Sequence, residues 1–214
     1  YKLKKLEYTD YDSSDIAVKE KSNIKIKKKK GKLDKLFSEI NTKLLYGKIG
    51  IGHTRWATHG KPSDVNSHPH NDFHSNITIV HNGIIENFKK IKENLSQNGY
   101  QFLSKTDTEV AANLISYYYE GDLLEAVNKA VKKFKGSFSM AIISDKDEER
   151  IIAVRKNSPL VIGVGENEHF LASDIPAYLD YTNEFYILED EEISDITKNK
   201  VEIYSFQGYK INDT

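Results

Sequence analysis

The sequence predicts an α+β domain in which helices pack on sheets. Short runs rich in β-branched and aromatic residues occur in both halves of the chain, and stretches with helical periodicity lie between them. The chain has only 4 prolines among 214 residues, with no internal repeat and no flexible proline-rich linker. We therefore expect residues 1–214 to form one domain with a hydrophobic core between its layers.

Composition excludes several classes of function. Hydrophobic residues make up 38% and charged residues 29%, which is typical of a soluble globular protein. Lys and Arg number 31 against 32 Asp and Glu, and this balance argues against nucleic-acid binding. No apolar run could span a bilayer and no signal peptide opens the chain, so we expect no membrane partner and a cytoplasmic location. The absence of cysteine excludes disulfides, thiolate zinc sites and cysteine catalysis within these residues.

The first residues predict the end of an amphipathic helix, because Leu3 and Leu6 share a side that the neighbouring lysines avoid. The chain begins with Tyr1 rather than Met, so we expect further residues upstream. The lysine-rich run 22–31 predicts a solvated hairpin tip rather than a nucleic-acid patch, since the overall charge is balanced.

Periodicity and turn residues then divide the chain into elements. Helices are predicted over 33–45, 84–97 and 123–134. Strands are predicted over 47–53, 76–80, 138–143, 151–154, 160–164, 170–172, 185–188 and 201–204. Residues Thr106 and Glu109 fit a capping box, in which each side chain accepts the other residue's amide hydrogen, ahead of a further apolar helix.

Six of the seven histidines fall between residues 53 and 83. They are His53, His59, His68, His70, His74 and His81. A metal site is one interpretation, but the chain lacks a His-Glu-x-x-His helix, and His68 and His70 on one strand would point to opposite faces. We favour histidines satisfied by loop backbone groups, with no bound metal.

The segment HTRWATHG at 53–60 follows a glycine-rich strand and suits a ligand-binding loop. Arg55 offers a planar fork that can hold a carboxylate at two points, and Trp56, the only tryptophan, can supply an apolar cover. The alternative is that Arg55 forms a surface ion pair and Trp56 fills the core.

Two further features have a structural and a functional interpretation. Asn82-Gly83 is an ordinary turn, or it presents an amide and a backbone N–H to an oxyanion. Asp107 is a carboxylate that favours the start of a helix, or it is a partner for a substrate ammonium.

Taken together, several motifs place the chain near a known family. They are HTRWATHG at 53–60, HPH at 68–70, HNGIIEN at 81–87, TDTEV at 106–110, KNSPLVIGVGENEHFLASDIPAYLDYT at 156–182 and ILED at 187–190. In this combination nearly the whole chain resembles the glutaminase domains of glucosamine-6-phosphate synthases. Related amidotransferases that use phosphoribosyl pyrophosphate share the fold but not this set of motifs.

The resemblance implies an N-terminal-nucleophile hydrolase fold, a four-layer αββα sandwich of two antiparallel sheets. It also implies that glutamine is hydrolysed by an N-terminal cysteine whose own α-amino group is the base. The ammonia would pass to a sugar-isomerase module of the same parent chain, which converts fructose 6-phosphate to glucosamine 6-phosphate and forms a homodimer. The resemblance implies no cofactor.

The resemblance also implies roles for individual residues. Arg55 would hold the α-carboxylate of glutamine and Asp107 its ammonium. Asn82 and Gly83 would form the oxyanion hole. Thr58 and His59 would line the glutamine loop, and Trp56 would gate the ammonia channel.

The chain departs from the family near its start. Thr9 and Asp10 stand where the family has Arg-Gly, close to the nucleophile, and Asp15 stands where it has Gly. A Gly-to-Asp change strains the backbone wherever φ is positive. These departures, with the missing cysteine, leave three hypotheses: a fragment of an active synthase, a glutamine- or glutamate-binding domain without turnover, and a metal-dependent hydrolase.

Overall fold

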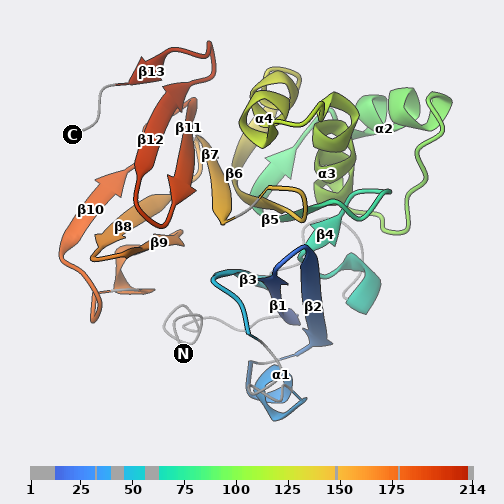
Figure 1. Ribbon diagram of the computed structural model, residues 1–214. Helices are drawn as coiled ribbons and strands as arrows, with labels where there is room; N and C mark the ends of the chain where they lie inside the picture. Colours follow the sequence, from blue (N-terminus) through green and yellow to red (C-terminus); the bar gives the residue numbers. More distant parts are fainter. Residues whose placement is uncertain are drawn as a thin grey trace.

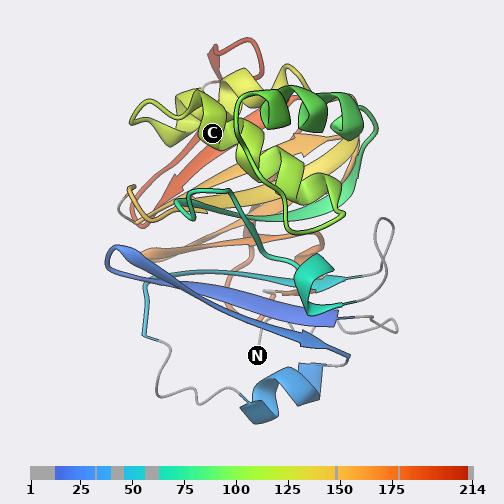
Figure 2. The same ribbon diagram turned by 90° about the vertical axis from the view of Figure 1, so that its right-hand side faces the viewer.

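The computed structural model describes residues 13–31, 33–39, 46–55, 63–147, 149–177 and 179–211. The helix expected before residue 9 and the second half of the helix expected over 33–45 lie outside these ranges. Within the ranges, the chain forms four layers (Figures 1 and 2).

A seven-stranded antiparallel sheet is the central layer, with the strand order β13-β12-β11-β7-β6-β5-β4. Its strands are β4 (His70–Asn71), β5 (Ile77–Ile85), β6 (Gly136–Ser144), β7 (Arg150–Lys156), β11 (Glu192–Thr197), β12 (Val201–Ser205) and β13 (Lys210–Ile211). One face is covered by the helices α2 (Phe88–Gln97), α3 (Asp107–Tyr118) and α4 (Leu123–Val131).

Two three-stranded antiparallel sheets lie on the opposite face of the central sheet (Figure 2). The first contains β1 (Ser13–Glu20), β2 (Asn23–Lys30) and β3 (Ile49–Arg55), in the order β2-β1-β3. The second contains β8 (Val161–Gly165), β9 (Glu168–Ala172) and β10 (Glu184–Ile187), in the order β10-β8-β9. Helix α1 (Leu33–Glu39) covers the first of them, and the short 3-10 helices η3 (Asp64–Asn66) and η4 (Ile175–Ala177) lie in connections. The resemblance implied two sheets. The structure has three, because the β layer that packs against the central sheet is divided into two separate sheets.

Apolar side chains fill the spaces between the layers. Phe138, Ile142 and Ile115 belong to the cluster between the helices and the central sheet, and all three are fully buried. Ile51 of β3 and Val80 of β5 belong to the cluster between the central sheet and the first small sheet. Burial of apolar surface on both faces of the central sheet is the main stabilising contribution of this arrangement.

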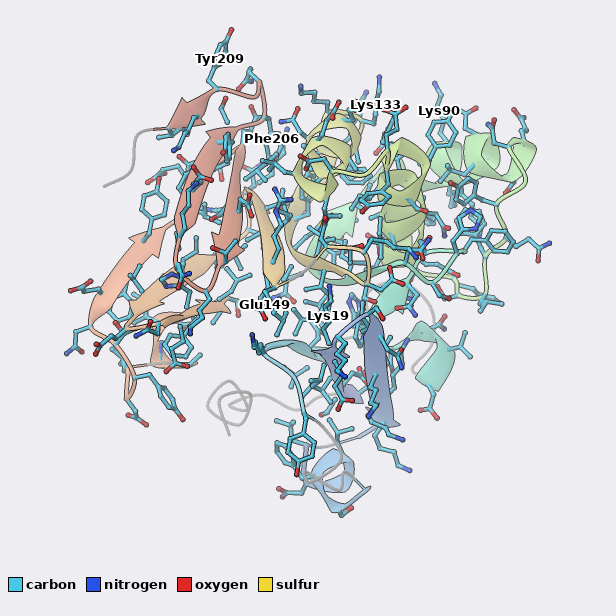
Figure 3. The ribbon with its side chains drawn as sticks, in the orientation of Figure 1. Lys19, Lys90, Lys133, Glu149, Phe206 and Tyr209 are labelled. Carbon is cyan, nitrogen blue, oxygen red and sulfur yellow. The ribbon has the colours of Figure 1, made fainter. Side chains whose placement is uncertain are left out.

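A buried lysine ties the first small sheet to the central one. The ammonium of Lys19 on β1 donates to the carbonyl oxygen of Ser144 at 2.6 Å and to that of Asp147. Figure 3 shows Lys19 in the space between these layers, whereas Lys90 and Lys133 point outward from the helical layer. Only 6% of Lys19 is exposed, so this charge is satisfied by the carbonyl groups that surround it rather than by water.

All the strands predicted downstream of residue 137 are confirmed, with ends shifted by a few residues. The predicted strand 47–53 is β3, and the helix predicted over 123–134 is α4. The predicted turn at Asn82-Gly83 is wrong, because β5 continues through both residues to Ile85. The helix predicted from Ile84 therefore begins only at Phe88.

The lysine-rich run is a strand rather than a hairpin tip. Residues 23–30 form β2, and the turn of the hairpin is at Lys21 and Ser22. Lys28 is not solvated as expected, since its ammonium donates to the carbonyl oxygen of Ser67 at 2.8 Å. Burial lowers the pKa of Lys28.

No helix within the described ranges has the length and apolar character needed to cross a membrane.

Candidate active site

Asn82 lies where β5 becomes accessible to solvent. The strand is buried from Ile77 to His81, and residues 82–84 are exposed. Along β5, Ile77 and Ile79 pack toward the helices while Val80 packs toward the first small sheet. Side chains alternate along a strand, so Asn82 shares the face of Val80.

The carboxamide of Asn82 is held by a histidine from the facing sheet. Nε2 of His53 on β3 lies 2.7 Å from Oδ1 of Asn82. With the amide in this orientation, Oδ1 accepts a hydrogen bond for which Nε2 of His53 is the donor. Nδ2 of Asn82 makes no hydrogen bond with any residue that the structure describes.

Gly83 has a backbone that only glycine adopts readily. Its φ is +123°, and a Cβ at this position would lie 2.1 Å from the carbonyl oxygen of Ser137 on the paired strand β6. Both observations exclude a side chain here. The exposed stretch that begins at Asn82 therefore depends on glycine for its path.

Asp107 is the first residue of α3 and is anchored to the same strand. Its Oδ2 accepts the backbone N–H of Ile85 at 2.8 Å, and only 4% of the residue is exposed. Oδ1 accepts no hydrogen bond from the described part of the chain. Both interpretations of Asp107 remain compatible with this position, since it also lies in the first turn of α3.

The helix start confirms half of the expected capping box. Thr106 is the N-cap, and its hydroxyl accepts the amide of Glu109 at 3.3 Å. The reciprocal bond is absent from the described contacts, because the carboxylate of Glu109 accepts instead from the amides of Leu103 and Ser104. This second bond was predicted wrongly because the loop before the cap offers the carboxylate nearer donors.

Four of the clustered histidines form a packed block behind these residues. The rings of His53 and His68 stack with centroids 4.3 Å apart, and His68 meets the ring of His70 edge-on at 5.2 Å. Nδ1 of His68 accepts the backbone N–H of His81 at 3.2 Å. His68 precedes β4 instead of lying in it, and its ring contacts that of His70, so the expectation that the two side chains point to opposite faces is wrong.

Side-chain hydroxyls also hold this block. Nδ1 of His81 lies 3.0 Å from the hydroxyl of Thr108, and Nε2 of His70 lies 3.1 Å from that of Thr106. The expectation that loop backbone groups satisfy the histidines is therefore only partly right. Among the described residues, no group of three or more His, Asp or Glu side chains is arranged to hold a metal ion. The block instead links Asn82 to both neighbours of Asp107.

Asp15 lies beside His53 in the small sheet. The β1–β3 register pairs Asp15 with His53, and the β1–β2 register pairs it with Lys28. Asp15 is fully buried, and its carboxylate accepts from the hydroxyl of Ser13 and from the amide of Lys29. Burial raises the pKa of Asp15 to about 7. The backbone here is ordinary paired strand, so the Gly-to-Asp departure causes no strain of the positive-φ kind.

The other expected site residues come from one loop. Arg55 is the last residue of β3, and its side chain lies outside the described part of the structure. Trp56, Thr58 and His59 also lie outside it. The structure therefore brings Asn82, Gly83 and Asp107 to one end of β5 and gives no position for the side chains of the glutamine loop.

A comparison with protein families identifies the family of this chain. Residues 53–180 match a family described as a glutamine amidotransferase domain. This chain belongs to that family. The matched range contains every residue that the sequence suggested for the site, from Arg55 to Asp107.

Curated relatives of this glutamine amidotransferase domain are longer proteins. It is 50% identical to glutamine–fructose-6-phosphate aminotransferase (isomerizing) of Clostridium tetani over 209 residues, which cover 98% of this chain and 34% of that protein. The protein with the same name from Aquifex aeolicus is 51% identical over 210 residues, covering 98% of this chain and 36% of its own length. The chain thus spans about a third of the length of these relatives.

Solved structures confirm the fold class. The glutamine phosphoribosylpyrophosphate amidotransferase from B. subtilis, complexed with ADP and GMP, matches with a TM-score of 0.84 at 23% identity. The match covers 96% of this chain and 45% of that one. A predicted glutamine amidotransferase from Pseudomonas aeruginosa matches with a TM-score of 0.60 at 17% identity. At these identities the matches concern the fold alone.

Sequence reasoning missed the contribution of His53. In the sequence this residue is one of the clustered histidines, with no feature that sets it apart. The spacing could have placed it, because His53 continues the alternation of Ile49 and Ile51, whose side chains pack toward the central sheet. The partner across that interface, Asn82, is not visible in local sequence.

Proposed function

We propose that this domain hydrolyses glutamine and supplies ammonia for the conversion of fructose 6-phosphate to glucosamine 6-phosphate. Identities near 50% to two proteins named glutamine–fructose-6-phosphate aminotransferase (isomerizing) support this proposal. The structural observation that carries it is that the Asn82 amide and the Asp107 carboxylate are both held at one end of β5. The Asn82 amide faces solvent with its donors unused by the described residues, and three residues further on Ile85 anchors the Asp107 carboxylate.

The chemistry of amide hydrolysis needs hydrogen-bond donors for an oxyanion. Attack of a thiolate on the side-chain carbonyl carbon of glutamine forms a C–S bond and moves an electron pair onto the oxygen. Asn82 Nδ2 and the Gly83 N–H would stabilise this oxyanion by hydrogen bonds. The C–N bond then breaks, the nitrogen leaves as ammonia after protonation, and water hydrolyses the thioester to glutamate. The thiolate has to come from outside these 214 residues, which contain no cysteine.

Selection of an α-amino acid needs a fixed anion and a fixed cation. In this proposal Asp107 binds the ammonium through Oδ1, and Arg55 binds the α-carboxylate in a bidentate manner. Thr58 and His59 line the same loop, and Trp56 gates the passage of ammonia. The position of Arg55 at the end of β3 supports its role, since His53 on the same strand contacts Asn82.

The wider assembly is part of the same proposal. A sugar-isomerase module would receive the ammonia, and the two activities would reside in one parent chain that dimerises through that module. The length of the curated relatives, about three times that of this chain, supports such a module. The homodimer and the cytoplasmic location stay predictions.

Binding of glutamine to this chain tests the proposal without turnover. Calorimetry with wild type should show a glutamine complex, and Asp107→Asn should remove it at millimolar glutamine. Asparagine keeps an acceptor for the Ile85 amide but loses the charge that binds the ammonium, which preserves the helix start. Lys90→Ala on the exposed outer surface of α2 is the matched control and should bind like wild type.

Two results would contradict the proposal. One is a wild-type chain that binds no glutamine or glutamate at millimolar concentration. The other is an Asp107→Asn variant that binds as tightly as wild type. Truncating one partner of a buried charge pair weakens binding by on the order of 2–5 kcal/mol, which corresponds to a decrease of tens to thousands of fold.

A further inference from the structure

His53 projects from β3 into the interface between two sheets. Ile49 and Ile51, four and two residues earlier, pack in the core between β3 and the central sheet. His53 continues their face and is 9% exposed. Its ring therefore reaches across the interface at the point where β5 turns from buried to exposed.

The hydrogen bond to Asn82 sets the direction of an amide. A carboxamide that faces solvent can rotate about its last torsion, and its oxygen and nitrogen can exchange places. Donation from Nε2 of His53 at 2.7 Å holds the oxygen inward. Nδ2 is consequently directed away from His53, so that a ligand meets a donor and not an acceptor.

The ring of His53 is itself fixed from behind. His68 stacks on it at 4.3 Å with an interplanar angle of 19°. Nδ1 of His68 accepts the backbone N–H of His81, which immediately precedes Asn82 in β5. The imidazole, the strand that bears Asn82 and the ring that supports both form one packed unit, so the amide is oriented before any ligand arrives.

We propose that His53 is a positioning residue of this site: its Nε2–H orients the Asn82 amide so that Nδ2 donates to the side-chain carbonyl oxygen of glutamine. The proposal rests on the proposed function, because it assigns a ligand atom to that amide. It extends the site from residues that would touch glutamine to one that acts through Asn82. His53 makes no contact with the ligand in this arrangement.

The protonation of His53 is the first test and needs only the wild-type chain. Long-range ¹H–¹⁵N spectra of the labelled protein near neutral pH should show His53 with its proton on Nε2 and an unprotonated Nδ1. A proton on Nδ1 with an unprotonated Nε2 overturns the proposal, since Asn82 would then have to donate to His53 and present its oxygen to the ligand. This measurement stands even if a variant fails to fold.

Binding of two related ligands is the second test. Glutamine and norvaline share the α-carboxylate and ammonium, but norvaline lacks the carboxamide. His53→Phe keeps an aromatic ring against His68 and removes the donor, so it should weaken glutamine binding roughly three- to tenfold and leave norvaline binding unchanged. His53→Gln, whose side-chain amide can donate to Asn82, should recover part of the loss.

The outcomes separate this proposal from the proposed function. Equal losses for glutamine and norvaline in His53→Phe would show a general structural role and overturn it. So would unchanged glutamine binding in His53→Phe while Asp107→Asn abolishes it, and in that case glutamine recognition itself would stand. A wild-type chain that binds neither ligand would overturn the proposed function instead.

Discussion

Nε2 of His53 and Oδ1 of Asn82 are 2.7 Å apart, although the two residues belong to different sheets and are 29 positions apart in the chain. The bond connects the strand that ends at Arg55 with the strand that presents Asn82 and Gly83. A change in the packing of the two sheets would therefore change the position of β3, which ends at Arg55, relative to Asn82 and Gly83 on β5.

Replacement of Asn82 by Ala should reduce glutamine hydrolysis in a form of the protein that carries the N-terminal cysteine. Loss of one oxyanion donor lowers kcat by about 10²–10³-fold, and KM should change much less because the bond strengthens in the transition state. Steady-state kinetics would measure both. Asn94→Ala, at an exposed position of α2, is the control. An unchanged kcat in Asn82→Ala would remove this residue from the oxyanion hole.

Gly83→Ala should destabilise the fold. The new Cβ would meet the Ser137 carbonyl oxygen at 2.1 Å, and φ of +123° is unfavourable for alanine. Strain of this backbone kind alone costs about 1–3 kcal/mol. Urea unfolding measures the loss. Gly99→Ala separates the two causes, because Gly99 has φ of +87° and no atom within 4 Å of the added Cβ. Equal losses in the two variants would contradict the steric contribution.

The buried carboxyl of Asp15 should make stability depend on pH. Its pKa rises from 3.8 to about 7 on folding, chiefly through burial. The folded state thus holds a proton that the unfolded state has released, and stability from this group should fall as pH increases from about 4 to about 7. The full change is on the order of 4 kcal/mol. Urea unfolding of wild type and Asp15→Asn at several pH values measures it. Parallel pH profiles for both proteins would contradict this assignment.

The 214-residue chain by itself should show no glutaminase activity. It contains no cysteine, and no Ser or Thr in it stands in a motif that could replace that nucleophile. Loss of a nucleophile lowers the rate by several orders of magnitude. Incubation with glutamine and an assay for glutamate checks this. Turnover at the rate of an ordinary glutaminase would show that another residue attacks the amide.

Strands composed mainly of apolar residues could be predicted from the sequence. Strands with buried polar residues, which are stabilised by partners far away in the chain, were missed. Strand β11 contains Glu192, Ser194 and Asp195, all buried. Arg150 on β7 forms two hydrogen bonds of 2.7 Å with the carboxylate of Asp195, which offset the burial of its charge. The residues next to Asp195 in the sequence do not reveal Arg150 as its partner, so β11 could not be recognised as a buried strand from its own residues.

The candidate site shows the same limit. Asn82-Gly83 has the composition of a turn, but pairing with β6 carries β5 past it as far as the Ile85–Gly136 pair. The motif resemblance named Asn82, Gly83 and Asp107, and the structure places all three at one end of β5. The connections that hold them, from His53 and from the Ile85 amide, arise only when two sheets and a helix meet. Local sequence could therefore indicate the candidate site residues but not the residues that support them.

The enclosed ammonium of Lys19 makes the junction of the two β layers observable by chemical labelling. An amine-reactive reagent reaches Lys90 or Lys133 directly from solvent, whereas Lys19 must first leave the Ser144 and Asp147 carbonyl groups. Its labelling rate would therefore report how often these layers separate, in competition with unfolding of the whole domain. A ligand that bridges β3 and β5 would slow that reaction at a lysine it never touches.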